Sequence, residues 1–190
     1  MSERLNAAIA AIDAANAKDP GAVDGRPEAL LYGERMSAEQ ARLYPAASEP
    51  LQIACRGQHI ERWLLPRADF PAGRDGYLAW RAEQGARHAA RVAGIMSAAG
   101  YGGAEVARAS RMLRKDGIKR DAEVQALEDV ACFTFLRHYF LPFAAGRDPG
   151  EVLRIVRRTA RKMSARARSA ALETFDLPPE MAEAFASQMP

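Results

Sequence analysis

The sequence predicts an all-α fold, a single compact multi-helix domain that covers residues 1–190. Alanine, leucine, arginine and glutamate dominate the composition, and all four favour helix. β-branched residues are scarce, and no segment shows the strict alternation of polar and apolar residues that is typical of a strand. The length of 190 residues and the hydrophobic fraction of 48% are ordinary for one globular domain.

Apolar periodicity and helix-breaking residues predict the individual helices. Their expected ranges are 3–17, 27–44, 48–63, 75–99, 103–114, 121–142, 149–174 and 179–188. Asp19-Pro20-Gly21 ends the first helix, and Ser48 is placed to cap the third. A loop from Leu65 to Pro71 precedes the fourth helix, and a turn from Gly100 to Gly103 follows it. Asp148-Pro149-Gly150 begins the seventh helix.

Cysteine use and hydropathy indicate a cytoplasmic protein. Cys55 and Cys132 lie in apolar runs, as buried thiols of a reducing compartment do. The N-terminus lacks the apolar block of a signal peptide, and no stretch approaches the roughly 18 apolar residues of a membrane span. We therefore expect no membrane partner. The net charge of +3 is too small to indicate nucleic-acid binding by itself, and nothing indicates an oligomeric state.

Two neighbouring carboxylates are the least expected feature of the predicted core. Glu128 and Asp129 lie on or beside the apolar stripe of the helix 121–142, which is apolar almost all round. A carboxylate on a buried face is costly unless it is paired, hydrogen-bonded or bound to a metal ion. An ion pair with an arginine is the plainest alternative to a functional role.

Two histidines are also predicted to face inward. His88 shares a stripe with Val92 and Ile95 on the helix 75–99, and His59 lies beside Cys55 on the helix 48–63. Imidazoles and carboxylates that converge from separate helices can build a metal or acid–base site inside a bundle. Ordinary hydrogen bonding in the core is the alternative for each histidine, and we expect His138 to be structural.

Basic residues accompany these positions and favour a phosphate-binding rim. Those near the acidic and histidine-bearing helices are Arg56, Arg62, Arg81, Arg114, Lys115, Lys119 and Arg120. A denser run in the helix 149–174 comprises Arg154, Arg157, Arg158, Arg161, Lys162, Arg166 and Arg168. Such a face could bind RNA or an acidic partner, although the absence of interleaved aromatic residues gives nucleic acid weak support. A solvated surface is the alternative for both groups.

Four blocks of sequence carry a resemblance to a known family. They are Leu31–Ser37, Gln58–Trp63, Val124–Ala131 with its continuation to Phe140, and Arg161–Ser164. Through them the chain resembles a family of small bacterial and fungal proteins known only as a domain of unknown function. The resemblance covers residues 5–172 and leaves 175–190 as a C-terminal helical extension. It implies a fold but no established activity.

The order of elements also resembles the HD superfamily of metal-dependent phosphohydrolases, which are all-helical. The pattern of that superfamily is an early histidine, a His-Asp pair, a downstream histidine and a late aspartate. His59 stands at the paired histidine, His88 at the downstream histidine and Asp129 at the late aspartate. Met36 occupies the place of the early histidine, and Ile60 that of the paired aspartate. The standard site is therefore degenerate.

This second resemblance implies an HD-domain-like helical bundle that hydrolyses a nucleotide or another phosphate ester with the help of a divalent metal ion. The expected metal ligands are His59, His88 and Asp129, the expected general base or further ligand is Glu128, and the expected phosphate-binding residues are Arg81 and Lys115. Because methionine and isoleucine cannot replace imidazole and carboxylate on a hard ion, the metal could be absent. The alternative is a non-catalytic HD-like domain that binds a nucleotide, RNA or a protein through its basic face.

Overall fold

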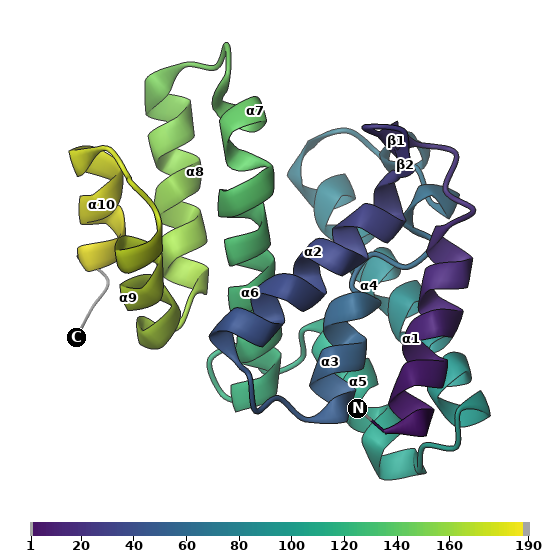
Figure 1. Ribbon diagram of the computed structural model, residues 1–190. Coiled ribbons are helices and arrows are strands. Elements are labelled where there is room, and N and C mark those ends of the chain that lie inside the picture. Colours follow the sequence, from purple (N-terminus) through teal and green to yellow (C-terminus); the bar gives the residue numbers. More distant parts are fainter. Residues whose placement is uncertain (1, 188–190) are drawn as a thin grey trace.

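The computed structural model describes residues 2–187, and nearly all of its regular secondary structure is helical (Figure 1). The helices are α1 (Glu3–Asn16), α2 (Glu28–Leu43), α3 (Glu49–Arg56), α4 (Gly73–Ala98), α5 (Gly103–Arg114), α6 (Ala122–His138), α7 (Phe140–Ala144), α8 (Pro149–Lys162), α9 (Ala165–Thr174) and α10 (Pro179–Ala186). Two short 3-10 helices, Arg62–Leu64 and Arg67–Asp69, precede α4. A small antiparallel hairpin of β1 (Ala22–Val23) and β2 (Arg26–Pro27) precedes α2. The predicted all-α class is confirmed.

Helix α6 lies between two groups of helices, α1–α5 and α8–α10 (Figure 1). It contacts α2, α3 and α5 on one side and α8 on the other. Every residue from Val124 to Val130 is buried, because neighbouring helices cover the helix nearly all round. At the C-terminal end, α10 packs on α8 and α9 and buries Ala184 and Phe185.

The two positions that depart from the HD pattern belong to the hydrophobic core. Met36 on α2 is fully buried, and Ile60 is 1% exposed. The hydroxyl of Thr134 on α6 donates a hydrogen bond to the Met36 sulfur at 3.2 Å. Both side chains therefore contribute to packing between helices.

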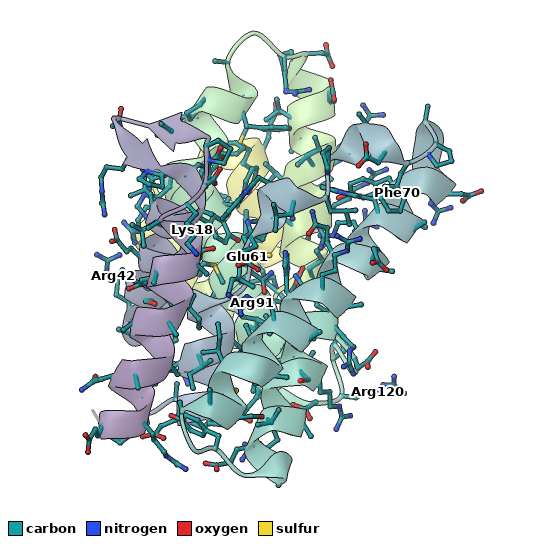
Figure 2. The ribbon with its side chains drawn as sticks, turned by 90° about the vertical axis from the view of Figure 1, so that its right-hand side faces the viewer. Lys18, Arg42, Glu61, Phe70, Arg91 and Arg120 are labelled. Atoms are coloured by element: carbon teal, nitrogen blue, oxygen red, sulfur yellow. The ribbon has the colours of Figure 1, made fainter. Side chains whose placement is uncertain are left out.

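The helix expected over 48–63 ends at Arg56, so its last seven residues were wrongly predicted. Gly57 ends the helix where the chain passes close to α4, and a Cβ there would lie 2.6 Å from Val92 Cγ2. The chain then turns back, with Glu61 in the left-handed region at φ 51°. Asn16 accepts a hydrogen bond from the Glu61 amide, and Glu61 pairs with Arg91 at 3.0 Å (Figure 2).

The helix expected over 149–174 is also interrupted. Helix α8 ends at Lys162, and Ser164 caps α9 by accepting a hydrogen bond from the Ala167 amide. The predicted continuous basic face is therefore wrong in its second part. Arg166 donates to the Leu43 carbonyl at 2.7 Å, and Arg168 is 5% exposed and donates to the Met163 carbonyl.

Other helix ends differ less. The expected helix 121–142 divides at Tyr139 into α6 and α7. The last helix was expected to reach residue 188, which lies outside the described residues. Within residues 2–187, every helix is too short or too polar to cross a lipid bilayer.

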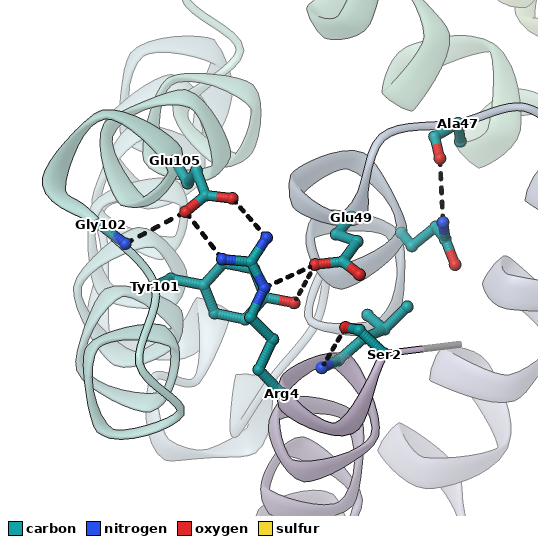
Figure 3. A network of polar contacts seen from close by, with 9 residues as sticks. Ser2, Arg4, Ala47, Glu49, Tyr101, Gly102 and Glu105 are labelled. Atoms are coloured by element: carbon teal, nitrogen blue, oxygen red, sulfur yellow. Dashed lines mark hydrogen bonds and ion pairs between the residues drawn. The ribbon is translucent and has the colours of Figure 1, made fainter.

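A polar network fixes the N-terminal helix to the bundle (Figure 3). The guanidinium of Arg4 donates to Glu49 at the start of α3 and to both carboxylate oxygens of Glu105 on α5. It also lies over the ring of Tyr101, whose hydroxyl donates to Glu49. One arginine thereby joins three helices.

Candidate functional site

A large cavity lies where α2, α4, α6 and α8 meet the segment after α3, and a small cavity adjoins it between that segment, α4 and the end of α5. The large cavity has a volume of about 750 Å³, within the range of roughly 300–1,000 Å³ that is typical of small-molecule sites. The small cavity has a volume of about 190 Å³. The residues that line both are Gln58, His59, Arg62, Arg81 and Lys115. The two cavities therefore meet at these five side chains.

Both predicted histidines lie at the cavities: His59 lines both of them, and His88 lines the small one. The imidazole of His59 stacks on the ring of Tyr32, with ring centroids 3.9 Å apart, and the His88 ring lies 6.1 Å from it. Burial, with a smaller contribution from Arg62, lowers the pKa of His59 well below its ordinary value. The same two causes, with Arg81, lower the pKa of His88 to about 3. Both imidazoles are thus neutral at pH 7.

Glu128 faces the large cavity and is held by two lysines. Lys115 Nζ donates a hydrogen bond to one of its carboxylate oxygens, and Lys162 Nζ lies 3.7 Å from the other. Burial raises the pKa of Glu128, but the attraction of Lys115 and Lys162 outweighs it, so that the pKa is lowered overall. Lys115 follows α5 in the left-handed region, at φ 61°. Such conformations are uncommon outside glycine and are found repeatedly at functional sites.

Arg62 and Arg81 stand together without a carboxylate partner. Neither forms an ion pair anywhere in the part of the chain that the structure describes. The Arg62 guanidinium lies over the Trp80 ring at 4.6 Å, and Arg81 donates to the Tyr77 hydroxyl at 3.4 Å. Burial and then repulsion from Arg81 lower the pKa of Arg62. Uncompensated positive charge therefore lies where the two cavities meet.

Of the six predicted site residues, the structure brings five together around the cavities. These are His59, His88, Glu128, Arg81 and Lys115. Asp129 lines neither cavity. It is fully buried on another side of α6, where its carboxylate accepts hydrogen bonds from the Tyr44 hydroxyl at 2.6 Å, the Gln125 side chain at 2.9 Å and the Ser164 amide at 2.7 Å. The carboxylate thus joins α6 to the end of α2 and the start of α9.

The donor set does not fit a divalent ion. Over residues 2–187, no three histidine, cysteine, aspartate or glutamate side chains are grouped as a metal site requires. Glu128 is paired with lysines, and Asp129 lies outside the cavities. The nearby guanidinium groups of Arg62 and Arg81 would repel a divalent cation. Binding of a metal ion stays a prediction that this geometry does not support.

The remaining residues of the predicted basic rim are divided between several roles. Arg114 lines the small cavity. Arg56 forms a two-pronged ion pair with Asp13 at 2.6 and 2.7 Å and lines neither cavity. Lys119 donates to the Met163 carbonyl, and Arg120 projects from the surface (Figure 2). Only part of the rim therefore belongs to the site.

Sequence reasoning missed several residues that line the cavities. They are chiefly the aromatic residues Tyr32, Tyr77, Trp80, Phe135 and Tyr139, together with Gln58. The signal for Tyr32 and Gln58 was present, because both lie in the blocks Leu31–Ser37 and Gln58–Trp63 that carry the family resemblance. Nothing in the periodicity of α2 indicated that Tyr32 would stack on His59.

Residues 6–185 match the model of a family described as Domain of unknown function (DUF4202). The match covers nearly the whole chain and extends into α10, beyond the end at residue 172 that was expected from the sequence blocks. The family's description names no activity, ligand or partner. No curated protein and no solved structure matches the chain significantly.

Proposed function

The chain belongs to the DUF4202 family, and we propose that it binds a phosphorylated small molecule that carries an aromatic ring, such as a nucleotide. The unpaired Arg62 and Arg81 carry this proposal. Two neighbouring guanidinium groups repel each other, and a phosphate would relieve that repulsion because its oxygens accept charge-assisted hydrogen bonds from both. Planar guanidinium groups also match phosphate oxygens geometrically.

The walls of the large cavity supply an apolar, aromatic surface for the rest of the ligand. Rings that line it come from Tyr32, Trp63, Tyr77, Trp80, Phe135 and Tyr139. Aromatic side chains stack on planar bases whatever the base, so such a wall suits a nucleobase or a similar ring. A site that combines these rings with two guanidinium groups that have no carboxylate partner fits a nucleotide better than it fits phosphate alone.

Fluorescence titration tests the proposal directly, because both tryptophans of the chain, Trp63 and Trp80, line the large cavity. We expect adenosine 5′-monophosphate to change the emission, and adenosine or inorganic phosphate to bind more weakly. Substitution Arg81→Gln should weaken binding of the nucleotide by roughly 10- to 100-fold, since a hydrogen bond to a charged group contributes about 1.5–3 kcal/mol. Arg74→Gln is the matched control, because Arg74 is exposed on the same helix and lines neither cavity.

Equal affinity of wild type and Arg81→Gln for the nucleotide would contradict the proposal. Equal affinity of wild type for adenosine and its monophosphate would do the same, because the phosphate would then contribute nothing.

A relation to the HD superfamily, with metal-dependent hydrolysis and Glu128 as the general base, stays a second prediction. Metal analysis of protein purified without chelator, together with a screen of phosphate esters with and without divalent ions, tests it. If His59 is a ligand, His59→Ala should remove the bound metal. An unchanged metal content would reject that assignment.

The exposed face of α8 favours binding of RNA as an alternative function. Arg154, Arg157, Arg158 and Arg161 are exposed, and none forms an ion pair within residues 2–187. Binding of a single-stranded RNA should then weaken steeply as salt rises, and the double substitution Arg157→Gln/Arg161→Gln should flatten this dependence. Arg87→Gln on α4, which removes an exposed pair with Glu83, is the control.

A further inference from the structure

The charged residues that line the small cavity are all basic. They are Arg62, Arg81, Arg114 and Lys115, and no carboxylate is among the described residues that line it. Lys115 is paired with Glu128, whereas the three arginines form no ion pair within residues 2–187. The small cavity therefore has three positive charges that no carboxylate of the described chain neutralises.

All three arginines keep accessible surface. Arg114 is exposed, and Arg62 and Arg81 are half-buried. Burial is the largest cause that lowers the pKa of His59 and of His88, and repulsion from Arg62 and Arg81 lowers both further. Because such repulsion weakens with distance, both guanidinium groups lie close to the imidazoles that line the small cavity.

A glycine brings the end of α5 close to α4. Arg81, Gly85 and His88 are spaced by four and three residues, so they lie on one face of α4. A Cβ at Gly85 would lie 3.2 Å from the Leu113 carbonyl oxygen and 3.6 Å from the Arg114 Cα. The close approach of the two helices places Arg114, the last residue of α5, beside this face.

The two cavities differ in the residues that line them. Phenylalanine, tyrosine and tryptophan line the large cavity, but none lines the small one among the described residues. Arg62 and Arg81 line both cavities, whereas Arg114 lines the small one alone. The small cavity has a volume of about 190 Å³, several times the roughly 30 Å³ that one water molecule occupies in the liquid. A ligand with its ring in the large cavity and a phosphate on Arg62 and Arg81 therefore has room to extend toward Arg114.

We infer that the ligand is a nucleoside 5′-diphosphate, whose second phosphate occupies the small cavity and binds Arg114. The inference rests on the proposed function and adds the number of phosphates to it. One phosphate monoester carries a charge of about −1.5 to −2 at pH 7, which leaves at least one of the three arginines uncompensated. A second phosphate adds about one more negative charge, and its oxygens accept charge-assisted hydrogen bonds from the Arg114 guanidinium.

Other ligands match this lining less well. A nucleoside monophosphate leaves Arg114 without an anion. The third phosphate of a nucleoside triphosphate would meet no further arginine among the described residues that line the small cavity, so we expect it to add no affinity. A divalent cation would meet four basic side chains and no carboxylate.

The test compares adenosine 5′-monophosphate, 5′-diphosphate and 5′-triphosphate by the same tryptophan fluorescence, without divalent ions. The wild-type protein should bind the diphosphate about 10- to 100-fold more tightly than the monophosphate, the range expected for one charge-assisted hydrogen bond. Arg114→Gln should reduce this preference toward one and leave the affinity for the monophosphate nearly unchanged. Arg120→Gln is the matched control, because Arg120 is exposed and lines neither cavity.

Circular dichroism should verify that each variant folds, and Arg114→Ala decides if Arg114→Gln does not. Equal or weaker binding of the diphosphate than of the monophosphate to wild type overturns the inference but leaves the proposed function intact, provided Arg81→Gln still weakens both. A full preference for the diphosphate in the folded Arg114 variant, an equal loss in Arg120→Gln, or tighter binding of the triphosphate also overturns it. If no nucleotide binds to wild type, the proposed function fails together with the inference.

Discussion

Neighbouring carboxylates on α6 have different environments because successive residues of a helix point in directions about 100° apart. Glu128 faces the large cavity and its two lysines, whereas Asp129 faces the end of α2 and the start of α9. The first is a candidate for function, and the second accepts three hydrogen bonds in the interior. Each carboxylate can be buried without a large loss of stability, because hydrogen bonds or ion pairs from its own partners offset the cost of removing it from water.

Asp129→Ala should destabilise the protein without changing nucleotide affinity. The substitution leaves the Tyr44 hydroxyl, the Gln125 amide and the Ser164 amide without their acceptor. We expect a loss of about 2–4 kcal/mol in the free energy of unfolding, measured with urea, since each unsatisfied buried donor costs about 1–3 kcal/mol and the site can partly relax. Asp129→Asn keeps one carbonyl acceptor and should lose less. Loss of nucleotide binding with unchanged stability would contradict the structural role.

The buried histidines should make stability depend on pH. The pKa of His88 falls from an ordinary value of 6.5 to about 3 on folding, so the unfolded chain binds the proton more tightly. Its contribution to stability is complete above about pH 6.5 and is lost as the pH falls toward 3. His59 acts in the same direction, and Glu128, whose pKa is also lowered, adds to the loss below about pH 4.5.

Urea unfolding between pH 6.5 and 4.5 separates the histidines from Glu128. His88→Gln should make the free energy of unfolding less steep over this interval, by up to about 1.4 kcal/mol per pH unit. His138→Gln should have a smaller effect, because His138 is partly exposed and lies 3.7 Å from Glu39. Identical slopes in wild type and His88→Gln would argue against a neutral, buried His88.

For single residues, the sequence predicted which side chains face inward but not which of them contact one another. Apolar stripes placed His88 and Glu128 inside the bundle, and both line the cavities. The same stripe could not distinguish Asp129 from Glu128, because the direction that matters depends on which helix packs on each side. Lys115, which follows α5 and donates a hydrogen bond to Glu128, has a left-handed backbone conformation. The periodicity of the sequence does not reveal such a conformation.

Individual helices were predictable where a local signal ends them. Helix α5 has the expected bounds, 103–114, because Gly102 precedes it and the Glu105 side chain accepts a hydrogen bond from the Gly102 amide. The end of α3 was missed because Gly57 and Glu61 make a turn that packs against α4. Such a turn depends on tertiary contacts, which no window of sequence contains.

The stability of the protein should depend on Ser164, the residue that caps α9 at its junction with α8. Ser164 Oγ accepts a hydrogen bond from the Ala167 amide, so Ser164→Ala leaves one amide of the first turn unpaired. We expect the substitution to lower the free energy of unfolding by about 1 kcal/mol and Ser164→Gly by only a few tenths of that amount. Thermal or urea denaturation measures both. Equal stability of the alanine variant and wild type would show that the cap contributes nothing.

The whole molecule is organised around α6. The sequence predicted the all-α class and a central helix, but not how the other helices are arranged around that helix. The apolar character of the segment all round indicated a central helix, and the structure places it between α1–α5 and α8–α10 (Figure 1). Only the structure shows which helices pack on each side of α6. The large cavity depends on this pairing, since its walls come from both groups.

Because α6 is enclosed by both groups, its backbone amides have no route to solvent short of opening the molecule. Hydrogen–deuterium exchange should therefore be slowest over residues 124–136, with a protection free energy close to that of global unfolding. Amides of the exposed segment 66–75 should exchange through local fluctuations far sooner. Early exchange in α6 would mean that α8–α10 detach from it in the native state.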